Sequence, residues 1–252
     1  MRIQSLEVEL AESRGRVADM EQSWEQWLSL ISHDLRGPLT LILGYVQTVL
    51  QHLPDEKAHD QDRHDLDAAI NAALRLDKMI SEIVDAARIE AHLLTLTPTE
   101  IELPPIVRHQ VQKAQRRYPG RRIRVSIPDE LPVLFADGRR VGQIIATFLS
   151  NAILFSSQTS PVTVSVTRSA DHVGVAVADD GLGLTEAEKQ HLFEKFYRHE
   201  RAREVRREGL GLSLLVAKHL AMRLHGQLWV ESHGPDRGST FYLSLPIARV
   251  SS

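Results

Sequence analysis

The sequence has no cysteine among its 252 residues. Without thiols the chain cannot form disulfides, use a thiol nucleophile or bind metal through thiolates. It also has no run approaching the roughly 20 apolar residues of a membrane span, and its charged start does not resemble a signal peptide. A net charge of -3 gives no general attraction to nucleic acid or anionic membranes. We therefore expect a cytoplasmic chain, or the cytoplasmic part of a longer protein, with no nucleic-acid or membrane contact of its own.

The N-terminal 31 residues carry apolar side chains at alternating spacings of three and four. These residues, interrupted at Ser13, are Ile3, Leu6, Leu10, Val17, Met20, Trp24, Trp27 and Ile31. A heptad pattern of this length predicts a coiled coil, and we favour a parallel dimer. An amphipathic helix packed on its own domain is the alternative, although no nearby segment offers it a surface. We place the coiled-coil helix at residues 1–28.

The segment Ser32-His33-Asp34-Leu35-Arg36-Gly37-Pro38 follows in the same predicted helix. His33 is an ionisable nucleophile beside the carboxylate of Asp34. A histidine next to an acid is more often a solvated surface pair, so this segment alone decides nothing. Apolar residues at helical spacing continue beyond Pro38, and because proline lacks an amide hydrogen, we expect a bend one turn after His33.

Two helices joined by a turn near Pro54 are predicted from here to about residue 95. Apolar residues recur at helical spacing from Leu39 to Leu50 and again from Leu66 to Ala87. Two such helices cannot bury both apolar stripes alone, but two copies can, as a dimeric four-helix bundle. We place this domain at 29–95.

Three prolines between Thr95 and Pro105 interrupt the helical pattern and predict a domain boundary, with a linker at 96–102 and a second domain at 103–248. There, helical and alternating patterns follow one another. The predicted helices are Leu103–Arg117, Gly138–Phe155, Glu186–Phe193 and Leu210–Leu224, and the predicted strands are Arg122–Ile127, Val162–Val166, His172–Ala178, Gln227–Ser232 and Thr240–Leu245. Their order predicts an α + α/β chain whose second domain is a two-layer α/β sandwich.

Polar residues at a spacing of four mark one face of the helix after Asp137. Gln143, Thr147 and Asn151 lie on this face, opposite apolar neighbours. The amide oxygen of Asn151 could bind Mg²⁺, which usually keeps waters and substrate phosphates as its other ligands. A polar stripe facing solvent is the alternative.

A predicted strand ends at Asp179 and opens into a glycine-rich turn. A carboxylate at a strand end can accept a hydrogen bond from an exocyclic amine, and Gly181 and Gly183 would let the backbone approach a flat ring closely. An ordinary turn would use the same residues. Thr185 and Glu188 then form a capping-box pattern for the next helix.

A charged run up to Glu208 separates Leu192–Arg198 from a second glycine-rich segment, Gly209-Leu210-Gly211-Leu212. The run fits a solvated loop or a flexible lid with arginines over phosphates. Glycines at the start of a helix expose backbone amides to an anion, which suits phosphate. The element order excludes a Rossmann fingerprint, and the P-loop lysine is missing.

Together these segments resemble the sensor histidine kinases of two-component signalling. Ser32 to Thr40 resembles that family's H box, Asp137 to Ser156 its N box, Asp179 to Gly183 its first glycine box, Leu192 to Arg198 its F box, and Gly209 to Leu212 its second glycine box. The resemblance covers nearly the whole chain after about residue 25, and the five motifs occur in the family's order.

The resemblance implies a dimeric phosphoacceptor domain and a Bergerat-type ATP-binding domain, with ATP and Mg²⁺ as cofactors and a response regulator receiver domain as partner. By matching position, His33 would accept the phosphoryl group, Asp34 would polarise it, Asn151 would bind Mg²⁺, and Asp179 would bind the adenine amine. The other expected nucleotide contacts are Phe155, Gly181, Gly183, Lys195, Arg198, Gly209, Leu210, Gly211 and Thr240.

Three departures from the family pattern lie near the expected phosphates. Thr147 stands where the family usually has a second asparagine, Leu154 where it has a basic residue, and Arg207 where it has a glycine. They motivate a rival interpretation, a degenerate kinase acting as a dimeric scaffold. Another Bergerat-type ATPase is a further alternative, which the helical hairpin with His33 argues against.

Gly37 generates a prediction about dephosphorylation. It lies four residues after His33, on the same helix face, where the family commonly has a threonine or asparagine that positions water for dephosphorylating the partner regulator. Because glycine has no side chain for this task, we predict a kinase with weak phosphatase activity. The measurement is the loss of phosphate from a phosphorylated partner; rapid, His33-dependent loss that is not reversal of phosphotransfer would contradict the prediction.

Overall fold

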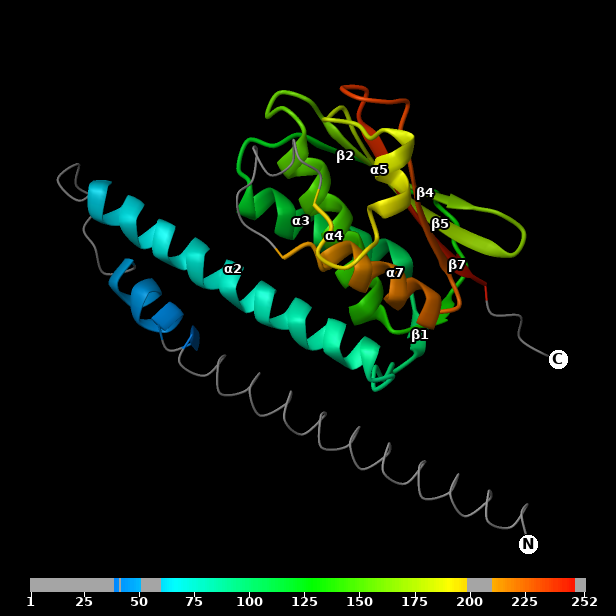
Figure 1. Ribbon diagram of the computed structural model, residues 1–252, viewed down its shortest axis with the longest axis horizontal. Coiled ribbons are helices and arrows are strands. Elements are labelled where there is room, and N and C mark those ends of the chain that lie inside the picture. Colours follow the sequence, from blue (N-terminus) through cyan, green and yellow to red (C-terminus); the bar gives the residue numbers. More distant parts are fainter. Residues whose placement is uncertain (1–38, 41, 51–59, 199–209, 248–252) are drawn as a thin grey trace, which may run out of the picture. The chain divides into compact units, whose positions relative to one another are not determined.

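The computed structural model describes residues 39–40, 42–50, 60–198 and 210–247. The predicted coiled coil, His33, Asp34, Gly37 and Gly209 lie outside these ranges, as does the turn near Pro54. The chain divides into two compact units, Met1–Leu94 and Thr95–Ser252 (Figure 1). None of the helices in the described ranges combines the length and the apolar character needed to cross a membrane.

The described part of the first unit is helical. Residues 42–50 form a helix, and α2 runs from Asp60 to Glu90, as the spacing of apolar residues predicted. Leu39, Ala73, Ile80 and Val84 form a buried cluster, against which Leu43 packs. Each helix therefore buries one line of apolar side chains against the other.

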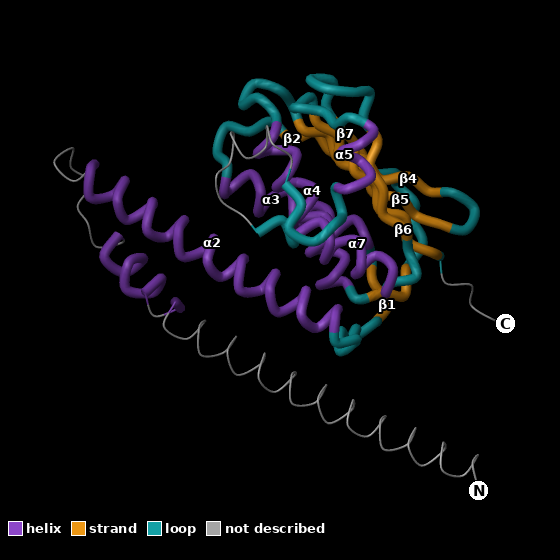
Figure 2. Tube along the Cα trace, in the orientation of Figure 1, coloured by secondary structure: helices purple, strands orange, loops and turns teal. Residues whose placement is uncertain are grey.

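A five-stranded sheet forms the centre of the second unit (Figure 2). Its strands, in spatial order, are β2 (Ile123–Ser126), β4 (Val162–Arg168), β5 (His172–Asp179), β7 (Ser239–Pro246) and β6 (Gln227–Glu231). The pair β2–β4 is parallel and the other pairs are antiparallel. Buried residues alternate along β4, β5 and β7, because successive side chains point to opposite faces of a sheet.

Helices cover one face of this sheet, which confirms the predicted two-layer α/β sandwich (Figure 2). They are α3 (Leu103–Arg117), α4 (Gly138–Phe155) and α7 (Ser213–Arg223). Phe148 of α4 is fully buried, and its ring centroid lies 5.4 Å from that of Phe241 on β7. A short helix, α5 (Glu186–His191), carries the predicted capping box between Thr185 and Glu188.

The structure adds two short strands that the sequence analysis missed. β1 (Thr99–Ile101) pairs antiparallel with β3 (Leu134–Ala136). The range 96–102, predicted to be a linker, instead contributes β1 to the second unit. Strands of three residues are too short to show alternation. The nearby Pro104 and Pro105 lie in the first turn of α3, where the backbone amides have no partner within the helix and a missing amide hydrogen therefore costs no hydrogen bond.

Asp137 joins this small sheet to the start of α4. One of its carboxylate oxygens accepts hydrogen bonds from the backbone amides of Arg139 and Arg140, and the other accepts from the amide and hydroxyl of Thr97. Burial alone would raise the pKa of Asp137, but these hydrogen bonds outweigh it and lower the pKa. The N-cap therefore fixes where α4 begins and ties it to the chain ahead of β1.

Candidate nucleotide-binding site

The polar face of α4 contributes Asn151 to the candidate site. Thr147 is buried, and its hydroxyl donates to the carbonyl oxygen of Gln143 at 3.1 Å. The side-chain oxygen of Gln143 in turn accepts from Arg140 at 2.8 Å. Asn151 lies one turn beyond Thr147 and is half-buried. Because the Thr147 hydroxyl bonds its own helix, the half-buried amide of Asn151 is the stronger candidate on this face for binding a metal ion.

Asp179 is a buried carboxylate at the end of β5, with 7% of its surface exposed. Its Oδ1 accepts from the amide of Gly181 at 2.8 Å, and its Oδ2 accepts from the hydroxyl of Ser239 at 2.8 Å. Burial raises the pKa of Asp179 because it disfavours the charged form, and the hydrogen bonds from Ser239 and Gly181 oppose this effect. The two bonds hold the carboxylate in one orientation.

Ser239 is a site residue that the sequence analysis missed. Thr240 was predicted to contact the nucleotide, but in the β5–β7 ladder Ser239 pairs with Asp179 and Thr240 with Ala178. Side chains alternate along a strand, and that of Thr240 hydrogen-bonds Tyr242 on the other face of the sheet. The hydroxyl beside Asp179 therefore belongs to Ser239. The sequence does hold a signal for this: Ser239 is two residues before the apolar Phe241, so in a strand both side chains lie on the same face of the sheet.

The first glycine box packs against the end of α4. Gly181 forms an isolated β-bridge with Ser156, and the amide of Leu182 donates to the carbonyl oxygen of Phe155 at 3.2 Å. A Cβ on Gly181 would overlap that same oxygen. Gly183 has a φ of 60°, and a side chain there would collide with the backbone of the turn at Gly234. These glycines permit backbone approaches that no other residue allows.

The second glycine box meets the F-box segment. Gly211 has a φ of 68°, and a Cβ there would lie 2.6 Å from the carbonyl oxygen of Tyr197. The half-buried Leu210 precedes it. In the F-box segment the ammonium of Lys195 lies 5.4 Å from the ring centroid of Phe196, and Arg198 is half-buried. Residues on either side of the charged run are thus in contact.

The structure brings part of the predicted set together. Asp179, Gly181 and Phe155 are linked directly, and Asn151 lies one helical turn from Phe155. His33, Asp34 and Gly209 lie outside the described residues. Within the part of the chain that the structure describes, no group of three or more histidine and carboxylate side chains could hold a metal. The amide of Asn151 with phosphate oxygens suits Mg²⁺, which commonly keeps waters and substrate oxygens as ligands.

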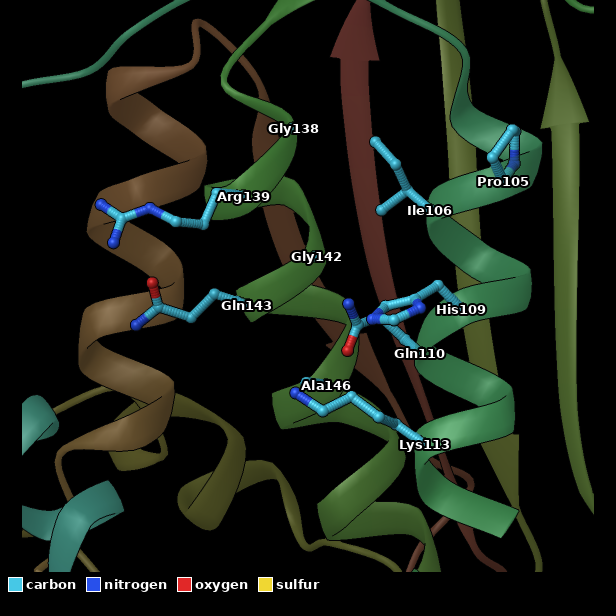
Figure 3. A pocket seen from close by; sticks show the side chains of 10 residues that line it. All are labelled: Pro105, Ile106, His109, Gln110, Lys113, Gly138, Arg139, Gly142, Gln143 and Ala146. Carbon is cyan, nitrogen blue, oxygen red and sulfur yellow. The ribbon is translucent and has the colours of Figure 1, made fainter. Parts of the chain in front are cut away.

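A separate groove of about 590 Å³ lies between α3 and α4 (Figure 3). His109, Gln110 and Lys113 reach into it from α3, and Arg139 and Gln143 border it on α4. Neither Asp179 nor Asn151 lines this groove, and Gln143 is the residue it shares with the polar face of α4. The groove is therefore distinct from the candidate site.

Two family models match the chain in succession. Residues 23–92 match the His Kinase A (phospho-acceptor) domain. Residues 136–249 match the histidine kinase-, DNA gyrase B- and HSP90-like ATPase. The first match contains the predicted phosphoacceptor His33, and the second contains Asn151, Asp179 and both glycine boxes.

Curated relatives include several adaptive-response sensory kinases named SasA. The protein from Synechococcus sp. (strain JA-2-3B'a(2-13)) is 28% identical over 244 residues, covering 96% of this chain and 64% of the relative. The protein from Microcystis aeruginosa (strain NIES-843 / IAM M-2473) is 30% identical over 231 residues, covering 89% of this chain and 59% of the relative. The chain thus spans less than two thirds of the length of these relatives.

Two solved structures illustrate the similarity in fold. Full-length ShkA, crystallised in complex with AMPPNP, gives a TM-score of 0.68 at 23% identity, covering 90% of this chain and 47% of that one. The Acinetobacter baumannii histidine kinase AdeS gives a TM-score of 0.55 at 16% identity, covering 86% of this chain and 98% of that one. At these sequence identities, the similarity shows a shared fold and no more.

Asp179→Asn tests the electrostatics of the site. The pKa of Asp179 is raised in the folded state. Its contribution to stability is therefore fully present at pH values below the ordinary carboxyl range, and it is lost as the pH rises through the folded-state pKa. A neutral amide avoids the loss, so the stability of Asp179→Asn relative to wild type should increase from about pH 4 to pH 7. Urea denaturation at several pH values measures it.

The matched control is Asp180→Asn, because Asp180 is the exposed neighbour of Asp179. Its stability relative to wild type should change much less over the same pH range. A loss of stability in Asp179→Asn that is the same at every pH would show that burial does not raise the pKa of Asp179.

Proposed function

The chain belongs to the sensor histidine kinases, whose phospho-acceptor and ATPase domains it carries in that order, and we propose that it phosphorylates His33 with ATP. We propose further that the phosphoryl group then passes to an aspartate in the receiver domain of a response regulator. The single observation that carries the ATP-binding part is the orientation of the Asp179 carboxylate at the first glycine box, held by Gly181 and Ser239.

Asp179 is the proposed adenine-binding residue. Its oxygens accept from the amide of Gly181 and from both the hydroxyl and the amide of Ser239. A carboxylate has about four acceptor positions, so one remains for a further donor. The 6-amino group of adenine is such a donor. A Cβ on Gly181 or Gly183 would meet the backbone of Phe155 or of Gly234, so the two glycines are needed to hold the turn in place beside this carboxylate. The backbone of Phe155 contacts the same turn, since its carbonyl oxygen accepts from the amide of Leu182.

The phosphates are proposed to lie toward Asn151 and Gly211. Asn151 would bind Mg²⁺ through its amide oxygen, and the ion would neutralise charge on the phosphates during transfer. Gly211 would bring backbone amides at the start of α7 close to the phosphates. Lys195 and Arg198, from the F-box segment in contact with Gly211, would add positive charge.

The proposed reaction is an in-line displacement at the γ-phosphorus. A neutral imidazole nitrogen of His33 forms the new bond to phosphorus while the bond to the bridging oxygen of ADP breaks, and ADP leaves. Asp34 would hold the proton on the other imidazole nitrogen and stabilise the positive charge that develops on the ring. Most of the rate comes from positioning and charge neutralisation, which the ATPase domain supplies.

The first unit is proposed to form a homodimer, and its exposed apolar side chains support this. Ile42, Tyr45 and Val49 are exposed by 54%, 72% and 53%, and on α2 Leu76 and Ile83 are exposed by 46% and 48%. At 3.6 residues per turn, these residues form a second apolar line, roughly 100° around the first helix and roughly 70° around α2 from the buried one. Hydrophobic faces of this kind are covered when two hairpins form a four-helix bundle.

Autophosphorylation is the test of the kinase proposal. Wild-type protein incubated with labelled ATP and Mg²⁺ should gain an acid-labile phosphate, while His33→Gln should gain none because it lacks the nucleophile. Asn151→Ala should reduce the rate at least tenfold, since a Mg²⁺ ligand is lost. Phosphate in His33→Gln would overturn the assignment of His33, and a wild type that gains no phosphate would favour the degenerate scaffold that Thr147, Leu154 and Arg207 motivate.

The dimer proposal is tested by charging the exposed apolar line. Ile42→Glu combined with Val49→Glu should raise the dimer dissociation constant by at least about tenfold, because each buried side chain of this size contributes roughly 1.5–3 kcal/mol. Sedimentation equilibrium measures this constant. Gln47→Glu, at an exposed polar position of the same helix, is the control and should leave it unchanged. An unchanged dissociation constant in the double variant would refute the proposed interface.

A further inference from the structure

Arg121 is a buried cation that neither the sequence analysis nor the proposed chemistry uses. It follows the turn that ends α3, where Gly120 has a φ of 84°, and lies two residues before the start of β2. Only 7% of its surface is exposed. Charged side chains are rarely buried to this extent without partners, so its surroundings indicate what it does.

The guanidinium of Arg121 lies at the C-terminal end of α4. It donates to the carbonyl oxygen of Ser157, to the hydroxyl oxygen of Ser156 and, at 3.5 Å, to the carbonyl oxygen of Ala152. The last carbonyls of a helix have no partners within the helix and carry partial negative charge, so a cation there is favourable. Arg121 thus fixes the last turn of α4, which carries Phe155 and lies directly after Asn151.

The same turn contacts the loop that begins at Asp179. Ser156, which binds the guanidinium, forms the β-bridge with Gly181, and Gly181 donates to the Asp179 carboxylate. The charge of Asp179 also acts on Arg121 directly. Burial lowers the pKa of the guanidinium, and the electrostatic attraction of Asp179 opposes this by raising it. Two routes, one through hydrogen bonds and one through space, therefore connect Arg121 to Asp179.

We propose that Arg121 is a positioning residue for adenine recognition: its guanidinium holds the last turn of α4 against the Asp179 loop and so places the carboxylate that accepts the 6-amino group. This inference rests on the proposed function and deepens it. Arg121 touches neither the base nor the phosphates, and its effect is transmitted through Ser156 and Gly181. Its loss should therefore weaken selection of the base while leaving phosphate binding intact.

The test compares Mg²⁺-ADP with Mg²⁺-IDP, since inosine has a carbonyl in place of the 6-amino group. Calorimetric titration of the full chain avoids phosphoryl transfer with these diphosphates. Wild type should prefer ADP by roughly 10- to 100-fold, the range of a hydrogen bond to a charged group. In Arg121→Met this ratio should fall at least about fivefold, through loss of ADP affinity, with IDP affinity changed less than about twofold.

Arg122→Met is the matched control, because it removes the same charge one residue away. Arg122 is exposed and donates to the carbonyl oxygen of Thr159 at 2.7 Å, outside the Asp179 loop. Its ADP-to-IDP ratio should equal that of wild type. Equal weakening of both nucleotides in Arg121→Met would mean that Arg121 only supports the fold, and an unchanged ratio would likewise overturn the inference.

If circular dichroism shows that Arg121→Met does not fold, two milder variants test the role of Arg121 in base selection. Arg121→Lys keeps the charge but not the forked donors, and Ser156→Ala removes the hydroxyl acceptor. Each should lower the ADP-to-IDP ratio by at least about twofold, and an unchanged ratio in both would overturn the inference. A wild type that binds neither nucleotide would refute the proposed function itself, an outcome distinct from a failure of the Arg121 effect alone.

Discussion

The candidate site depends on one close backbone contact, between Gly181 and the carbonyl oxygen of Phe155. No side chain fits at Gly181, because a Cβ would overlap that oxygen. The absence of a side chain allows the β-bridge from Gly181 to Ser156 and the hydrogen bond from Leu182 to Phe155. The end of β5 and the end of α4 are joined here, and the position of Asp179 relative to Asn151 follows from that junction.

Two buried carboxylates of this unit have pKa values shifted in opposite directions. At Asp137, hydrogen bonds from Thr97 and Arg140 outweigh burial and lower the pKa, so the ionised form favours the folded state. At Asp179, burial outweighs the bonds from Ser239 and Gly181 and raises the pKa. Asp137 therefore stabilises the fold, whereas Asp179 keeps an electrostatic penalty that a bound amine donor can relieve.

The sequence predicted those parts of the fold whose causes are local. The bounds of α3 and α4 agree with the prediction because Pro104 and Asp137 are start signals that act within one turn. Both glycine boxes were identifiable for the same reason, since a glycine indicates a backbone conformation or close approach at its own position. The strands β1 and β3 were missed because their pairing joins segments more than 30 residues apart and neither strand is long enough to show a period. Ser239 was missed because its place opposite Asp179 depends on how β7 pairs with β5, and the predicted strand began one residue later, at Thr240.

Helix α4 is fixed at both ends by charges that match its dipole. At the N-terminus the Asp137 carboxylate accepts from the amides of Arg139 and Arg140. At the C-terminus the Arg121 guanidinium donates to the carbonyl oxygen of Ala152 and, just beyond the helix, to that of Ser157. Both contacts reach beyond the helix, to Thr97 before β1 and toward the Asp179 loop after β5. Because both ends of α4 are anchored in this way, a shift of Asn151 or Phe155 along the helix axis would break contacts with Thr97 or with the first glycine box. A rigid helix held at two ends can therefore set the distance between Asn151 and Asp179, the residues proposed to bind the metal and the adenine, which flexible loops alone would leave undefined.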